Sequence, residues 1–255
     1  MTTIELYNFL DKLIPASLSC DWDNDGLMCC PNKDAEVKKA LIALDITERT
    51  VDYAIAGGFD TIISHHPLIF SKVSHLTEQG NTSRKLIKLV KNGISAMSFH
   101  TRLDAVDGGV NTVLASLLGF DNVTPFGPAN EEFGQIGTLT KPMALEDFCK
   151  EIKSKLKSSA LLYTDCGKSV QKVAILGGDG KDYIDAATAE GADTFVSGRF
   201  SYNFMAEAPE RGINLIEAGH FYTENPVCRR LEELIRSFDD SIKTEIINSN
   251  EVKVL

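Results

Sequence analysis

The chain has 255 residues, of which 43% are hydrophobic and 24% charged, and its formal net charge at pH 7 is −10. This composition is typical of a folded protein with a sizeable core, its acidic balance disfavours direct nucleic-acid binding, and no apolar run reaches the length of a membrane span. The N-terminus lacks the basic region and apolar block of a signal peptide, so we expect a cytoplasmic protein.

The six cysteines are scattered without a C-x-x-C pair. This spacing disfavours a thiolate zinc site and a disulfide framework, and we interpret most of these residues as buried thiols. Cys29 and Cys30 are neighbours, and adjacent cysteines are difficult to bridge geometrically. The sequence leaves the role of this pair open.

The first half of the chain alternates predicted helices and strands. Thr2 and Glu5 have the spacing of a capping box, which begins a helix ending before Pro15. A loop is expected over residues 20–32. The strands that follow are expected at 40–46, 60–64 and 94–99, with helices at 47–58, 83–91 and 109–118. Strand, helix, strand implies parallel pairing, so these residues predict an α/β lobe.

The alternation resumes beyond a polar segment at residues 121–132, which is predicted to be a linker because it holds two prolines, a glycine and several acids. Strands are expected at 135–140, 161–163, 173–176, 194–196 and 213–218. Helices are expected at 145–157, 182–190, 202–210 and 226–236. We therefore expect two α/β lobes, residues 1–125 and 126–255, with the segment from about 213 to 255 able to pack back on the first lobe.

Histidines and carboxylates follow several of the predicted strands. In open α/β sheets, functional groups gather beyond the carboxyl ends of the strands. The residues in that position are Asp45 at the edge of 40–46, His65 and His66 after 60–64, His100 and Asp104 after 94–99, and His220 and Glu224 after 213–218. A single histidine is usually an ordinary hydrogen-bonded residue, as we expect for His75 in its loop. The coincidence at several strand ends instead favours a metal site.

The adjacent His65 and His66 suggest more than one ion. Neighbouring side chains on an extended chain point in opposite directions, and Pro67 favours an extended backbone at His66. We therefore expect the two imidazoles to splay apart and to serve different ions of a dinuclear site. Two such ions usually share a bridging ligand, for which Glu224 is a candidate, while Asp104 offers a further oxygen.

Four segments together resemble the signature blocks of the GTP cyclohydrolase 1 type 2 homologues, also called the NIF-three-like family. These segments are "WDNDGL" (22–27), "SHHPLIF" (64–70), "HTRLDAVDGGVN" (100–111) and "GHFYTE" (219–224). The resemblance implies two interlinked α/β lobes, a toroidal homohexamer, and a dinuclear metal site at the carboxyl ends of the strands between the lobes. Its ligands fall on His65, His66, Asp104, His220 and Glu224, with Glu224 bridging.

His100 then becomes a candidate catalytic residue, which contacts the substrate or orients a ligand. The chain also departs from the family pattern, because it lacks the central insertion that some relatives carry and has Arg199 and Asn203 where many carry a glutamate and a histidine. Arg199 could bind an anionic group, although a structural salt bridge is the favoured interpretation. Asp23 and Asn24 could line the metal site or form the turn of their loop. The segment 176–182 could cradle a phosphate, but a tight turn is favoured.

Three functions suit these residues. The first is a metal-dependent hydrolase of a nucleotide or another phosphoester-like small molecule, in which two ions generate a hydroxide near neutral pH. Imidazole and carboxylate ligands without thiolate favour Zn, Fe or Mn. The second is a metal storage or delivery protein, and the third is a regulatory scaffold without turnover. The sequence identifies neither the substrate nor the physiological metal.

Overall fold

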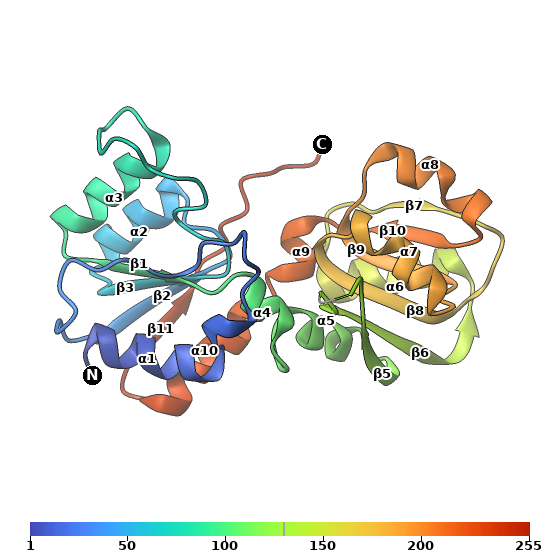
Figure 1. Ribbon diagram of the computed structural model, residues 1–255, viewed down its shortest axis with the longest axis horizontal. Coiled ribbons are helices and arrows are strands. Elements are labelled where there is room, and N and C mark those ends of the chain that lie inside the picture. The colour runs from blue at the N-terminus through green and yellow to red at the C-terminus, as the bar shows by residue number, and fades with distance from the viewer. Residues whose placement is uncertain (130) are drawn as a thin grey trace. The chain divides into compact units, whose positions relative to one another are not determined.

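The computed structural model describes residues 1–129 and 131–255, and the chain divides into two compact units (Figure 1). The first unit comprises Met1–Val106 and Val227–Glu251, and the second comprises Asp107–Pro226 with Val252–Leu255. Each unit is built on its own sheet, which confirms the predicted α/β class. Among the described residues, no helix combines the length and the apolar character that crossing a membrane requires.

The first unit contains a five-stranded sheet in the order β1-β4-β3-β2-β11. Strands β11, β2, β3 and β4 are parallel, and β1 is antiparallel to β4. Helices α2 and α3 lie on one side of this sheet, and α1 and α10 lie on the other (Figure 1). The elements are α1 Thr3–Leu13, η1 Ala16–Leu18, β1 Gly26–Cys29, β2 Lys39–Ala43, α2 Glu48–Gly57, β3 Thr61–Ser64, α3 Asn81–Lys91, β4 Ser95–Ser98, α4 Thr101–Ala105, α10 Val227–Phe238 and β11 Lys243–Ile246.

Local signals set the helix ends in the first unit. The predicted capping box forms at the start of α1, where the Thr2 side chain accepts from the Glu5 amide and the Glu5 carboxylate accepts from the Thr2 amide. Helix α2 begins after Thr47, whose side chain accepts from the Thr50 amide, and it ends at Gly58 with a φ of 62°. The left-handed conformation of Gly58 turns the chain directly into β3.

The second unit contains a six-stranded sheet in the order β5-β6-β8-β9-β10-β7. Strands β8, β9 and β10 are parallel, while β5, β6 and β7 pair antiparallel with their neighbours. The elements are α5 Val110–Leu118, β5 Asp121–Phe126, β6 Gly134–Met143, α6 Leu145–Leu156, β7 Leu162–Thr164, β8 Val170–Asp179, η2 Lys181–Tyr183, α7 Ile184–Ala189, β9 Thr194–Arg199, α8 Tyr202–Arg211, β10 Asn214–Glu217 and α9 His220–Glu224.

Alternate residues of the central strands fill two cores in the second unit. Val173 and Val196 face the core that α5 and α6 complete with residues such as Leu114. Ala174 and Phe195 face the opposite core, which α7 and α8 complete. Because the side chains of a strand alternate between the two faces, burial of both faces makes these strands almost continuously apolar. This burial fixes the strand register, and with it the position of the strand ends that carry the candidate site.

Two of the segments that differ from the sequence-based expectation are edge strands. Residues 26–29, predicted within a loop, form β1, a short strand that follows a polar segment and therefore leaves little periodicity to detect. Residues 121–126, predicted within a linker, form β5, whose side chains are exposed except for Phe126. An edge strand exposed on both faces does not need apolar alternation. Asn130, also within the predicted linker, lies outside the described residues.

Candidate metal centre

Three histidines of the first unit come together at one end of its sheet. His65 and His66 follow β3, and His100 follows β4, the neighbouring parallel strand. One potential ligand atom from each of these residues lies within 4.8 Å of the others. The carboxyl ends of adjacent parallel strands therefore bring His100 together with imidazoles that lie 34 and 35 residues before it in the sequence.

The tandem pair differs from the sequence-based expectation. The rings of His65 and His66 were expected to splay apart along an extended strand end, but their centroids are 4.9 Å apart with an interplanar angle of 42°. Residues 65 and 66 form a bend directly after β3, so the alternation of an extended strand no longer applies. The bend leaves His65 fully buried and His66 half-buried.

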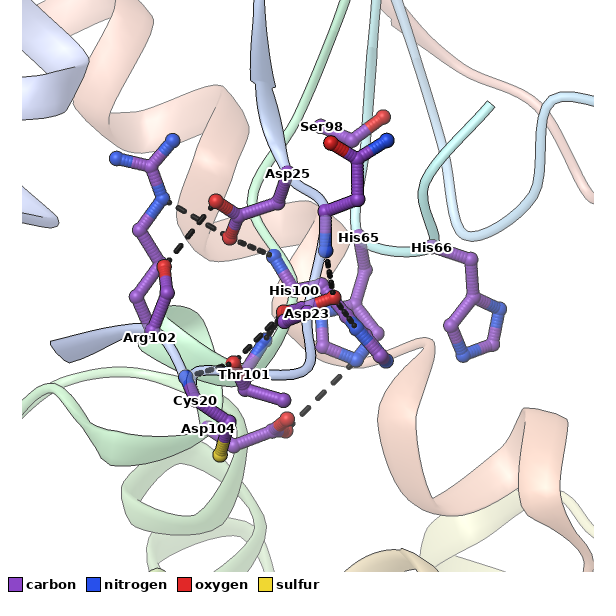
Figure 2. Close-up of polar contacts among 12 residues, drawn as sticks. Cys20, Asp23, Asp25, His65, His66, Ser98, His100, Thr101, Arg102 and Asp104 are labelled. Carbon is purple, nitrogen blue, oxygen red and sulfur yellow. Dashed lines mark hydrogen bonds and ion pairs between the residues drawn. The ribbon is translucent and has the colours of Figure 1, made fainter. Parts of the chain in front are cut away.

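Each of the three rings is held through Nδ1 by a protein oxygen, as Figure 2 shows in part. The Nδ1 of His65 donates to the Phe99 carbonyl at 3.0 Å, and the Nδ1 of His66 donates to Asp45 Oδ1 at 2.7 Å. The Nδ1 of His100 donates to Asp23 Oδ1 at 2.8 Å. These oxygens are acceptors, so the proton of a neutral imidazole resides on Nδ1 and Nε2 keeps a lone pair. Oriented Nε2 atoms of this kind are typical metal ligands.

Asp104 adds a carboxylate to this cluster. Its Oδ1 atom lies 3.7 Å from Nε2 of His65 (Figure 2). A lone pair and a carboxylate oxygen repel each other unless a proton or a cation lies between them. Metal–ligand bonds of about 2.0–2.2 Å place two ligand atoms up to about 4 Å apart, so this spacing suits an ion bound to both. The donor set of the first unit therefore fits a transition-metal ion.

Asp23 connects the loop before β1 to the histidine cluster. Beyond its bond to His100, it accepts from the Thr101 amide at 3.0 Å and from the Thr101 hydroxyl at 2.7 Å. Burial raises the pKa of Asp23, but the hydrogen bonds from His100 and Thr101 outweigh this effect and hold the pKa well below its usual range. Asp23 is therefore an anion that fixes the orientation of His100. This contact favours a role for Asp23 in the candidate site over a role limited to the turn of its loop.

Arg102 stabilises the same loop through buried ion pairs, and this role was not predicted from the sequence. Its side chain is fully buried, and Nε donates to Asp25 at 3.0 Å while Nη1 donates to Asp11 at 2.6 Å. Asp25 also accepts from the His100 amide at 3.0 Å (Figure 2). Buried charges are almost always paired. An arginine two residues after a strand-end histidine, in a chain with a "DND" loop, could have suggested this ion pair.

The second unit presents a histidine and a glutamate on one short helix. Nε2 of His220 lies 2.9 Å from Oε2 of Glu224, one turn along α9, and the Glu224 side chain is 6% exposed. Helix α9 follows β10, so this pair also lies beyond the carboxyl end of a parallel strand. A buried carboxylate beside an imidazole nitrogen is a ligand pair that transition metals accept.

Glycines make room for this pair. Gly178 has a φ of +72°, and a Cβ there would clash with Oε1 of Glu224. A Cβ at Gly198 would lie 2.7 Å from the Cα of His220 and 2.6 Å from the Gly178 carbonyl oxygen. Both positions allow α9 to approach the ends of β8 and β9 closely. A β-carbon at either position would displace the candidate ligands.

In the glycine-rich segment 176–182, residues 176–179 end β8 and Gly180 connects this strand to η2. The glycine amides are used within the unit. Gly177 donates to Asn111 Oδ1 at 2.8 Å, Gly178 donates to Thr223 Oγ1 at 3.2 Å, and Gly180 donates to the Arg199 carbonyl at 3.1 Å. Amides with protein acceptors cannot also cradle a phosphate. The short strand-to-helix connection at Gly180 agrees with the favoured interpretation of a tight turn.

Two further sequence expectations can be compared with the structure. No described residue forms an ion pair or hydrogen bond with the Arg199 guanidinium, so the favoured salt-bridge interpretation is wrong for the described part of the chain. No disulfide forms among the cysteines that the structure describes. Burial, together with the neighbouring Cys30, raises the pKa of Cys29 to about 11, which disfavours its reactive thiolate.

The strand-end histidines and carboxylates on two α/β sheets define a class of candidate metal-binding proteins. The model of the DUF34/NIF3 family (NGG1p interacting factor 3) matches residues 1–253. The chain is 35% identical over 254 residues to a "GTP cyclohydrolase 1 type 2 homolog" of Clostridium perfringens, covering 98% of this chain and 96% of that protein. The chain therefore belongs to the DUF34/NIF3 family.

Solved structures agree with this family assignment. A hypothetical protein of Staphylococcus aureus matches with a TM-score of 0.88 and 29% identity, covering 100% of this chain and 99% of that one. A Bacillus cereus protein related to NIF3 matches with a TM-score of 0.89, 22% identity and the same coverage. At that lower identity, the similarity is evidence for the fold alone.

Proposed function

We propose that this chain binds two divalent transition-metal ions, and that His65, His66 and Asp104 of the first unit act with His220 and Glu224 of the second. Glu224 is the proposed bridging ligand. The observation that carries the proposal is the set of three converging imidazoles, each anchored through Nδ1 by a protein oxygen. Metal-ligating histidines almost always have such an anchor on the ring nitrogen that does not bind the metal.

The nature of the donors limits the choice of metal. The candidate ligands are imidazole nitrogens and carboxylate oxygens, without thiolate. This combination suits Zn²⁺, Fe or Mn²⁺ better than Ca²⁺, which prefers six to eight oxygen ligands. The raised pKa of buried Cys29 and Cys149, about 11 in each case, also disfavours thiolate ligation by these residues.

The activity that we infer is metal-dependent hydrolysis of a nucleotide or another phosphoester-like small molecule. Bound divalent ions supply the Lewis acidity that such hydrolysis needs. The Phe99 carbonyl orients the ring of His65, and Asp45 orients the ring of His66. Asp23 orients His100, which is the candidate group for moving a proton or contacting the substrate. The name of the Clostridium perfringens relative is compatible with a nucleotide substrate.

The position of Arg199 favours a substrate that carries an anionic group. It ends β9, and its neighbour Gly198 lies against the backbone of His220. Its guanidinium has no ion-pair partner among the residues that the structure describes. A planar guanidinium that is not already neutralised binds phosphate oxygens well. We propose that it contacts an anionic group of the substrate.

The proposed assembly is a cytoplasmic homo-oligomer, a toroidal hexamer, as the resemblance to the NIF-three-like family implies. Direct nucleic-acid binding is not expected at a net charge of −10. Sedimentation of the purified chain measures this assembly, and a monomer would contradict it.

The metal proposal is tested by elemental analysis of freshly purified protein at known subunit concentration. About two transition ions per chain are expected, and His66→Ala should lose metal while the matched His75→Ala keeps it. Turnover is then measured with metal-loaded wild type on GTP and on a generic phosphomonoester. Turnover that disappears in His66→Ala supports the hydrolase.

The same experiment separates the alternatives. If the wild type binds metal reversibly but hydrolyses neither compound, metal storage or delivery replaces hydrolysis. If His66→Ala instead dissociates the oligomer or unfolds the first unit, the ions are structural, as a regulatory scaffold would require. Wild-type protein without transition metal would contradict the proposal as a whole.

A further inference from the structure

Two exposed aromatic rings stand beside the histidine cluster of the first unit. Trp22 is 60% exposed and Phe70 is 59% exposed, although large aromatic side chains are usually mostly buried. Their ring centroids are 6.4 Å apart with an interplanar angle of 69°, so they form an edge-to-face pair. Such a pair presents two roughly perpendicular apolar faces to the solvent.

Both rings contact the same histidine. The centroid of Trp22 lies 6.1 Å from that of His100, and the centroid of Phe70 lies 6.2 Å from it, each in an edge-on arrangement. His100 in turn contacts His65 and His66, at 5.2 and 5.7 Å between centroids. The exposed pair is therefore continuous with the candidate ligands rather than an isolated surface feature.

The loops that carry the pair are fastened to each other. The Asn24 side-chain amide donates to the Ile69 carbonyl at 2.5 Å, which joins the residue two after Trp22 to the residue before Phe70. Asp23, which lies between Trp22 and Asn24 in the sequence, accepts hydrogen bonds from His100 and Thr101. The two loops are consequently held together before any ligand arrives, which lowers the entropic cost of ordering them on binding.

We propose that Trp22 and Phe70 form a stacking platform for a planar heteroaromatic ring, so that the substrate of the proposed hydrolase is a base-containing nucleotide rather than a simple phosphoester. This inference rests on the proposed function. Aromatic side chains bind bases through their π faces with little dependence on base identity. The platform therefore selects for a flat ring and leaves the choice of base to other contacts.

Trp22 reports on this binding directly, because it is the only tryptophan of the chain. The full-length, metal-loaded protein is titrated with GMP, AMP and ribose 5-phosphate while tryptophan fluorescence is followed. We expect saturable quenching by both nucleotides and none by the base-free phosphate. Quenching by all three alike, or by none, would overturn the platform.

Calorimetry of the variants then measures its contribution. Trp22→Ala and Phe70→Ala should each weaken GMP binding by about 5- to 150-fold, the range typical of losing one base–aromatic stack, whereas Phe70→Tyr should retain the wild-type affinity. Phe238→Ala is the matched control, since Phe238 is 41% exposed and stacks on Phe9. An equal loss in Phe238→Ala would overturn the proposal.

Metal content and assembly separate this inference from the proposed function. Both platform variants should keep the wild-type metal content and sedimentation coefficient. A fall to a smaller assembly in Trp22→Ala would instead assign the rings to an interface between copies and overturn the platform. Wild type without metal would contradict the proposed function, whereas metal-loaded wild type without base-dependent binding would contradict the platform alone.

Discussion

The two units supply candidate ligands in different ways. The first unit gathers its imidazoles from the ends of neighbouring strands and holds each ring by a separate oxygen, on Asp45, Phe99 or Asp23. The second unit places His220 and Glu224 one turn apart on a five-residue helix, which fits closely because of glycines. The first arrangement depends on hydrogen bonds and buried charge, and the second depends on space. The substitutions below test this difference.

The largest effect is expected from the buried ion pairs of the first unit. Arg102→Ala leaves Asp25, which is 5% exposed, without its cation, and breaking a buried pair costs about 3–5 kcal/mol. Hydrogen exchange should become faster in β1 and β4 and stay unchanged in β8 and β9. The exposed Arg236→Ala is the control and should cost less than about 1 kcal/mol. Uniform destabilisation of both units would contradict the assignment.

A smaller effect is expected from filling space in the second unit. Gly178→Ala should lower the free energy of unfolding for two reasons. A left-handed backbone costs an alanine about 1–2 kcal/mol, and the clash of its Cβ with Glu224 costs about 1–3 kcal/mol. Gly191→Ala is matched, because its φ is +77° and its Cβ would meet nothing within 4 Å. Denaturant unfolding should therefore show the larger loss for Gly178→Ala, accompanied by a loss of metal. Equal losses would show that the clash has no effect.

The oxygen anchors of the first unit should control metal affinity without controlling the fold. Asp45 accepts from His66 Nδ1 and from the Ser249 hydroxyl at 3.2 Å. Asp45→Asn should weaken metal binding by about 10–100-fold, because the anchor sets ring orientation and ligand basicity. Competition with a chromophoric chelator measures this change. Asp52→Asn, on exposed α2 surface, should leave the affinity unchanged.

The smallest effect is expected from the pH response of Asp23. Its pKa is depressed in the folded state, so its stabilising contribution is present above the unfolded value near 4 and is lost as the pH falls through the lower folded value. Asp23→Asn should cost about 1.5 kcal/mol at pH 6, and the difference from wild type should shrink as the pH falls below 4. A difference that is constant down to pH 3 would contradict this role.

Much of the fold could be predicted from local signals in the sequence. The Thr2 and Thr47 caps, the glycine after α2 and the buried strands are all determined by neighbouring residues. Strands β1 and β5 escaped prediction because a short edge strand need not alternate. The pairing of β11 with β2 joins residues about 200 positions apart in sequence, and no local pattern encodes such a contact.

The candidate site was only partly accessible to the same reasoning. Strand ends identified His65, His66, His100 and Asp104, because parallel strands bring their ends together. The predicted orientation of the His65 and His66 rings was wrong, because the observed orientation depends on a bend that the sequence does not show. The anchors Asp23 and Asp45 and the buried Arg102 were missed as partners, because hydrogen bonds between distant loops follow from tertiary packing.

Anomalous diffraction from crystals grown with Zn²⁺ tests the central claim most directly. The account predicts two peaks per chain, about 3.5–4 Å apart, with Nε2 of His65 and Nε2 of His66 bound to metal. The Nδ1 atoms should still donate to the Phe99 carbonyl and to Asp45. Absence of anomalous density at these histidines, or ligation through Nδ1, would contradict it.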